Sequence, residues 1–204
     1  YLKSTLQEVY GDQVQLEATQ VTAPEDAPET APAGPAVDYG VIMYGQQNLS
    51  ESNGWKTGAA EILKVELESL APGAVLGVFA GGETVRVTIQ AQAHQLLTSP
   101  ILGFLVRDRL GQDLFGENTL PFTAGSPLSI EPGQMFHAQF EFKLPMLPNG
   151  QYSMMASVAD GDLYNHIQHH WLHDAYLINV ASTKVRWGLV GISFDNILME
   201  TVPA

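Results

Sequence analysis

Apolar and polar residues alternate along much of the chain after residue 54, which is the period of β-strands that bury one face. The clearest run, residues 84–93, carries its apolar side chains at odd-numbered positions. Residues 134–142 and 151–158 alternate in the same way. In these two runs the apolar faces are Phe136, Ala138, Phe140 and Phe142, and Tyr152, Met154, Ala156 and Val158. The pattern predicts several half-buried strands.

Glycine and proline separate these runs at regular intervals. The turn signals are Pro72-Gly73, Gly81-Gly82, Pro132-Gly133, Pro148-Asn149-Gly150 and Asp160-Gly161. Short alternating strands with such turns between them are typical of an antiparallel β-sandwich. The sequence therefore predicts an all-β fold with little helix.

A β-hairpin is predicted between Gly103 and Thr119. An apolar run stops at Arg107-Asp108-Arg109, turns through Leu110-Gly111 and resumes at Gln112–Phe115. Opposite charges beside turn glycines more often hold a turn together than bind a ligand. We expect the charges here to be structural.

Four histidines lie close together in residues 165–180. His166, His169, His170 and His173 have the spacing of one helix face, where they could bind a transition metal. The same segment ends in Tyr-Leu-Ile-Asn-Val, which favours a strand and separates the histidines between two faces. We predict a strand and no metal site.

On that strand, Leu172, Tyr176, Ile178 and Val180 are expected in the core. The opposite face then carries His169, Trp171, His173, Ala175, Leu177 and Asn179. An exposed Trp171 can pack against a neighbouring loop or subunit. Alternatively, its indole can stack on a sugar ring while His169 and His173 bond to hydroxyl groups.

Uncharged polar side chains also alternate outward on the other predicted strands. They are Gln90, Gln92, His137, Gln139, Ser153 and Ser157. Such rows suit a neutral polysaccharide, although any solvated sheet face looks similar. Arg86 is the cation of this set, and Arg86 or Arg186 would be a partner for a terminal phosphate.

Composition narrows the classes of ligand and chemistry. The net charge of −13 argues against nucleic acid as a partner, because phosphate backbones need a basic surface. The absence of cysteine excludes disulfides and thiolate metal sites. The sequence has no P-loop, nucleophile elbow, dinucleotide-binding or zinc-protease motif, so we expect a non-enzymatic domain without a cofactor.

The first 38 residues differ from the rest. Leu2, Leu6 and Val9 suit a short amphipathic helix within residues 1–20, and residues 23–37 form an acidic, proline-rich linker. Residues 1–38 carry a net charge of −6, which leaves −7 for residues 39–204. We expect residues 1–38 to tether a sandwich domain, residues 39–204, to an N-terminal partner domain.

Three segments together resemble the Wzt C-terminal domain family, the carbohydrate-binding domains on the ATPase subunit of bacterial O-antigen ABC transporters. They are the Gly103–Thr119 hairpin, the Asp160-Gly161 turn, and the run from His170-Trp171-Leu172-His173-Asp174-Ala175 to Val180. The resemblance implies an immunoglobulin-like antiparallel β-sandwich that dimerises by exchanging a C-terminal strand. Here that strand would be Gly188–Phe194, with residues 181–184 as its hinge.

The resemblance also implies a function. Domains of this family bind the non-reducing end of a finished O-polysaccharide, often capped by methyl or phosphate, and couple it to export. The partners would be the polysaccharide, a second copy of the chain, and the ATPase and transmembrane subunits, in the cytoplasm at the inner membrane. A neutral hexose polymer such as a mannan suits the low basic content. The expected carbohydrate-binding residues are Trp171, His169, His173, His137, Gln139, Gln90, Arg86, Ser153 and Trp187, the last because it matches no family feature.

Two other classes remain open at this point. One is a β-sandwich for adhesion or subunit assembly, which would bind no glycan and expose a broad apolar patch. The other is a histidine-metal enzyme.

Overall fold

The computed structural model describes residues 39–182, together with Lys184, 188–192, Phe194, Ile197 and Met199. The predicted helix and linker in residues 1–38 lie outside the described residues, as do Trp187 and Arg186. The exchanged strand expected at residues 188–194 is described in part. No helix in the described part of the chain is long and apolar enough to cross a membrane.

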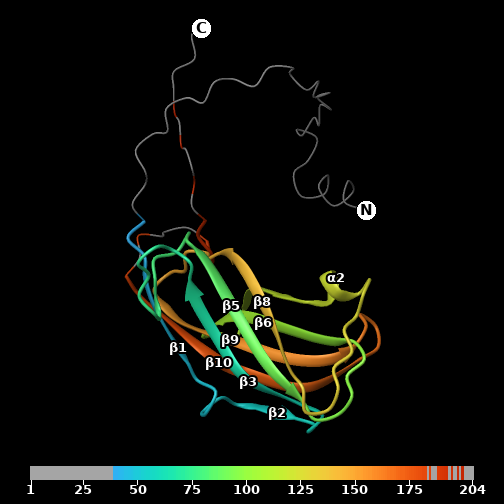
Figure 1. The fold of residues 1–204 in the computed structure, drawn as a ribbon. Coiled ribbons are helices and arrows are strands. Elements are labelled where there is room, and N and C mark those ends of the chain that lie inside the picture. The colour runs from blue at the N-terminus through green and yellow to red at the C-terminus, as the bar shows by residue number, and fades with distance from the viewer. Residues whose placement is uncertain are drawn as a thin grey trace, which may run out of the picture. The chain divides into compact units, whose positions relative to one another are not determined.

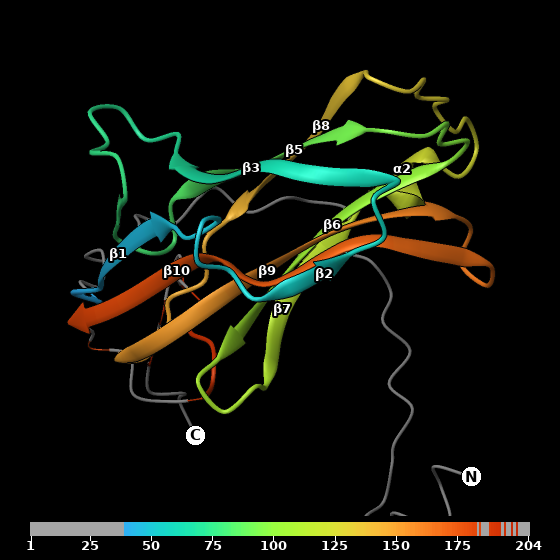
Figure 2. The same cartoon turned by 90° about the horizontal axis from the view of Figure 1, so that it is seen from below.

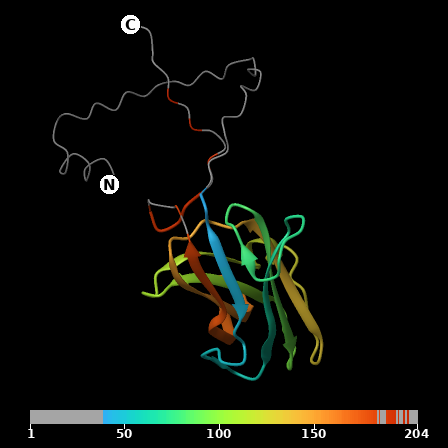
Figure 3. The same cartoon turned by 90° about the vertical axis from the view of Figure 1, so that its left-hand side faces the viewer.

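Seven strands form the larger of two antiparallel sheets (Figures 1 and 2). They are β1 (Ile42–Gln47), β2 (Gly54–Lys56), β4 (Val78–Phe79), β6 (Pro100–Asp108), β7 (Asp113–Asn118), β9 (Gly150–Gly161) and β10 (His166–Ser182). Their order is β4-β1-β10-β9-β6-β7, and β2 also pairs with β10. The C-terminal half of β10 therefore lies beside β1 (Figure 3), and β2 lies beside residues 170–172.

Three strands form the smaller sheet, in the order β3-β5-β8. Their bounds are β3 (Ala60–Ser69), β5 (Thr84–Ala93) and β8 (Met135–Lys143). Burial alternates along β5 as the sequence predicts, so its odd-numbered residues face the other sheet. The one described helix, α2 (Leu120–Thr123), is a single turn after β7.

The apolar core lies between the two sheets, which Figure 2 shows as separate layers. Val65, Val87 and Ile89 of the smaller sheet and Met154 and Ile178 of the larger one are almost inaccessible to solvent. Each such side chain stabilises the fold by about 1.5–3 kcal/mol through burial. Phe104 links the layers, because its ring lies 5.1 Å from that of Phe140 and 5.7 Å from that of Phe142. The predicted all-β antiparallel sandwich is confirmed.

The predicted hairpin is β6 and β7, and its charges hold the turn. Asp108 Oδ1 accepts the backbone N–H groups of Leu110, at 2.8 Å, and Gln112, at 2.9 Å. Gly111 adopts a φ of +80°, which favours glycine. Arg107 forms an ion pair with Asp113 across the hairpin. These contacts confirm the structural role expected for Arg107 and Asp108.

The expected faces of β10 are correct except at Ala175. Leu172, Tyr176, Ile178 and Val180 are buried as predicted, but Ala175 is buried too. The cause is an irregularity in pairing: β10 advances from Leu172 to Tyr176 while β9 advances only from Ala156 to Met154. Simple alternation therefore fails between Leu172 and Tyr176.

Candidate functional site

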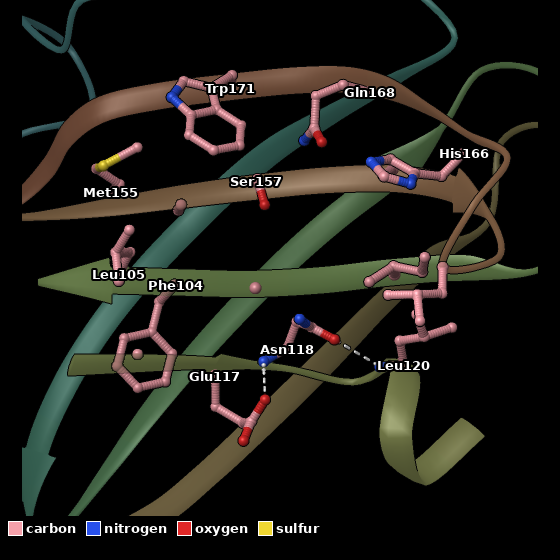
Figure 4. Close-up of a pocket in the computed structure, with 16 residues that line it drawn as sticks. Phe104, Leu105, Glu117, Asn118, Leu120, Met155, Ser157, His166, Gln168 and Trp171 are labelled. Carbon is pink, nitrogen blue, oxygen red and sulfur yellow. Dashed lines mark hydrogen bonds between the residues drawn. The ribbon is translucent and has the colours of Figure 1, made fainter. Parts of the chain in front are cut away.

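A hollow of about 400 Å³ lies on the outer face of the seven-stranded sheet, away from the core (Figure 4). Strands β6, β7, β9 and β10 supply most of its lining, and α2 borders one end. We call this feature the outer-face pocket. Its polar lining residues are Glu117, Asn118, Ser157, His166 and Gln168, and its larger apolar ones are Ile101, Phe104, Leu105, Leu120, Met155, Leu163 and Trp171.

One row of paired residues forms the middle of the pocket. Trp171 on β10 pairs with Ser157 on β9, Ser157 pairs with Gly103 on β6, and Gly103 pairs with Asn118 on β7. Directly paired residues of antiparallel strands project from the same face of the sheet. Residues that are 68 positions apart in the sequence, Gly103 and Trp171, therefore line one surface.

Gly103 contributes no side chain to the middle of this row, so the surface there is open to a ligand. A methyl group placed on it would lie 3.0 Å from the Asn118 Cβ, tighter than most contacts, and 3.5 Å from the Ser157 Oγ. Because glycine has no side chain, the space between Ser157 and Asn118 stays empty. The hollow depends on glycine at this position.

Hydrogen bonds fix several of the polar groups around the pocket. Asn118 Oδ1 accepts the N–H of Leu120 at 2.9 Å, and Glu117 Oε1 accepts the N–H of Asn118 at 2.8 Å. Gln168 Nε2 donates to the carbonyl oxygens of Val158 and His170. These bonds leave the Asn118 amide nitrogen and the Gln168 amide oxygen to face a ligand, one as donor and the other as acceptor.

His166 has its tautomer set by its backbone partner. Its Nδ1 lies 3.1 Å from the carbonyl oxygen of Asp162, which can only accept a hydrogen bond. Nδ1 therefore carries a proton, and in the neutral ring Nε2 is an acceptor. Hydrogen bonds from the Asn165 and Tyr164 backbone lower the pKa of the Asp162 carboxyl and hold this turn in shape.

The charge of the lining is sparse and negative. Glu117 is the one acidic residue among the lining residues, and neither lysine nor arginine is among them. A phosphate or carboxylate in the pocket would face Glu117 without a compensating cation. The pocket suits an uncharged ligand.

Four of the residues predicted to bind carbohydrate lie on the opposite side of the sandwich. Gln90 pairs with His137 on the outer face of the three-stranded sheet, and Gln139 lies one pair further along β8 on the same face, near Arg86. Arg86 is held by Glu141 at 2.6 Å and Glu68 at 2.9 Å, and these hydrogen bonds, that of Glu141 first, raise its pKa. Its charge is thus already compensated.

The other three described candidates share a sheet with the pocket but lie outside its lining. His173 Nδ1 accepts the indole N–H of Trp171 at 3.3 Å, and His169 Nδ1 lies 3.1 Å from Thr57 Oγ1. Ser153 pairs with Leu177 and Arg107, further along the sheet. Of the nine predicted residues, Trp171 is the one that lines the outer-face pocket among those the structure describes.

The histidines of β10 point to different neighbours. His170 faces the core, whereas His166, His169 and His173 each bond to a separate group. Within the described part of the chain, no three histidine, aspartate or glutamate side chains come close enough together to hold a metal ion.

Sequence reasoning missed Glu117, Asn118, His166 and Gln168 as site residues. Glu117 and Asn118 belong to a hairpin that we assigned to structure alone, and Gln168 falls before a pairing irregularity between Gln168 and His170. The available signal was Trp171 itself: once β9 and β6 are placed beside β10, the register leads from Trp171 to Asn118.

Comparison with known proteins gives one family and a set of similar folds. A family model described as the Wzt C-terminal domain matches residues 51–192. A solved structure described as "Crystal structure of the C-terminal domain of wzt" is similar at a TM-score of 0.59 and 17% identity, over 76% of this chain and 89% of that chain. At this identity the likeness shows the fold alone. No curated protein matches the chain.

Proposed function

Because the chain belongs to the Wzt C-terminal domain family, we propose that it is a non-catalytic module that binds the non-reducing terminus of an O-antigen polysaccharide in the outer-face pocket. The module would present the finished polymer to an ABC transporter for export. Its partners would be the ATPase and transmembrane subunits, at the cytoplasmic face of the inner membrane. Residues 1–38 would tether it to the ATPase domain.

The position of Trp171 is the observation that carries this proposal. Its aromatic ring borders a hollow that also presents a hydroxyl from Ser157 and amide groups from Gln168 and Asn118 (Figure 4). A pyranose has an apolar C–H face and a rim of hydroxyl groups. An aromatic ring with amide and hydroxyl groups around it complements both features.

The charge and apolar surface of the pocket support a neutral terminal sugar. Glu117 opposes an anionic cap, whereas Leu105, Met155 and Leu163 offer apolar surface to an uncharged group such as a methyl ether. A neutral polymer such as a mannan with an uncharged end fits this lining. We therefore favour the outer-face pocket over the face of Gln90, His137, Gln139 and Arg86.

A dimer formed through the C-terminal segment completes the proposal. Gly191 and Met146 exchange two backbone hydrogen bonds, of 2.7 and 2.9 Å, so residue 191 can act as a strand partner. Around it Leu189, Ile192 and Phe194 expose more than half of their surface. Exposed apolar side chains on a segment able to pair as a strand support its exchange with a second copy.

Binding of the O-polysaccharide by paired variants tests the proposed function. Immobilised wild-type protein should retain the O-polysaccharide of the source strain, and Trp171→Ala should lose it. His137→Ala, an exposed substitution on the opposite face, serves as the matched control and should retain it. Retention by Trp171→Ala with loss in His137→Ala would move the site to the three-stranded sheet. No retention by the wild type would favour an assembly module.

A further inference from the structure

We propose that the binding surface continues past Trp171 to a second sugar subsite on β2, formed by Trp55 with His169 and His173. The proposal rests on the function proposed above and extends it from a terminal sugar to a segment of the polymer. We call this group the edge subsite. No residue of the edge subsite lines the outer-face pocket.

Register places Trp55 directly beside Trp171. The two residues are paired between β2 and β10, and the neighbouring pairs on either side, Lys56 with His170 and Gly54 with Leu172, keep the same register. Paired residues share a face of the sheet. Trp55 therefore continues the row of Asn118, Gly103, Ser157 and Trp171 to the sheet edge.

Close backbone contact holds β2 in place along β10. A methyl group on Gly54 would lie 2.0 Å from the Trp171 carbonyl oxygen, so only glycine permits this approach. Beyond the ends of β2, the N–H of Thr57 donates to the carbonyl of His169 and the N–H of His173 donates to that of Asn53, both at 2.8 Å. Trp55 is thus carried on a fixed backbone, although 49% of its surface is exposed.

Two imidazoles supply polar groups beside the tryptophans. His173 Nδ1 accepts the Trp171 indole N–H, so the neutral ring carries its proton on Nε2 and donates from there. His169 Nδ1 lies beside Thr57 Oγ1, and the structure gives its Nε2 no partner among the described groups. An aromatic face can stack on the C–H face of a sugar ring while the imidazole nitrogens beside it bond to its hydroxyl groups.

The length of the row indicates what the ligand must be. From Asn118 to Trp55 it crosses four strand intervals of about 4.8 Å each, which gives about 19 Å. A single sugar ring cannot span that distance. The surface fits an oligosaccharide that lies across the strands, with its end in the outer-face pocket and an internal residue on Trp55.

Binding as a function of chain length tests the edge subsite. The probes are oligosaccharides from partial acid hydrolysis of the source strain's O-polysaccharide, fractionated by size and titrated calorimetrically into the full chain. Trp55→Ala should weaken binding of the longer fragments by roughly three- to tenfold and leave that of the shortest terminal fragment unchanged. Trp55→Phe should restore most of the loss, because it keeps an aromatic face.

Four results separate the outcomes. Trp171→Ala should weaken the binding of fragments of every length, because every fragment places its end in the outer-face pocket. Leu76→Ala removes another exposed apolar side chain, outside this surface, and should bind as the wild type does. If the wild type binds and Trp55→Ala binds every fragment equally well, the edge subsite is wrong while the pocket stands. If the wild type binds no fragment, the proposed function fails, and the edge subsite fails with it.

Discussion

His170 on β10 accepts the backbone N–H of Ile62 on β3 through its Nδ1, at 2.9 Å. The bond joins the two sheets, and His170 is only 7% exposed to solvent. Burial lowers the pKa of His170, while the negative charge of Glu61 raises it and the positive charge of Lys56 lowers it. The neutral ring with its proton on Nε2 leaves Nδ1 free to accept this bond, and burial favours that uncharged form. His170 is therefore a structural histidine.

We predict that the domain loses stability as the pH falls below about 6.5, in part through His170. The pKa of His170 in the folded state lies below its ordinary value of 6.5, so the unfolded chain binds the proton more readily. The contribution is complete above pH 6.5 and is lost as the pH falls toward the folded pKa. Urea unfolding at pH 7.5 and pH 5 measures the change.

His170→Asn is the control for this pH dependence. Asparagine keeps an acceptor near the position of Nδ1 and does not titrate, so its stability should change less between pH 7.5 and pH 5. His170→Leu leaves the Ile62 N–H without a partner and should cost about 1–3 kcal/mol at pH 7.5. Equal pH dependence in the wild type and His170→Asn would assign the effect to other groups.

Glu117 should reject anionic ends of the polysaccharide. Glu117→Gln removes the charge but keeps an acceptor for the Asn118 N–H. We expect it to bind neutral fragments nearly as the wild type does, and to improve binding of phosphate-terminated fragments by about 1 kcal/mol at low salt. Calorimetric titration before and after phosphatase treatment measures the difference. If the wild type binds phosphate-terminated fragments more tightly than dephosphorylated ones, the claim that the pocket suits an uncharged end is contradicted.

The fold followed from the sequence because its strongest signals are local. Residues 84–93 alternate without interruption, and β5 has those same bounds. The turn at Asp108 to Gly111 was recognisable from its own residues. By contrast, β2 has three exposed residues, too few for any period to be seen.

The candidate site was only partly predictable, because alternation shows that a side chain leaves the core but not which outer face it joins. Gln90 and His137 alternate just as Ser157 does, yet they lie on the other sheet. The pocket forms from the order of β10, β9, β6 and β7, which the residue pattern does not contain. Trp171 was identified from its outward-facing indole together with the family resemblance of the run that contains it.

The chain should sediment as a dimer. Removing residues 188–204 deletes the Gly191 partner of Met146 and the exposed apolar segment around it. We expect this truncation to give monomers of lower thermal stability in analytical ultracentrifugation and thermal melts. Arg109→Ala, an exposed turn substitution, is a control that should stay dimeric and change stability by less than about 0.5 kcal/mol. A stable full-length monomer would exclude strand exchange.

The most direct test of the central claim is to map the bound polysaccharide by NMR. On titration of the isotope-labelled chain with terminal O-polysaccharide fragments, we predict shifts at the backbone amides of Gly103, Asn118 and Ser157 and at the indole N–H of Trp171. The amides of Gln90, His137 and Gln139 should stay unchanged. Shifts confined to that second group, or no shifts at saturating polysaccharide, would contradict a glycan site in the outer-face pocket.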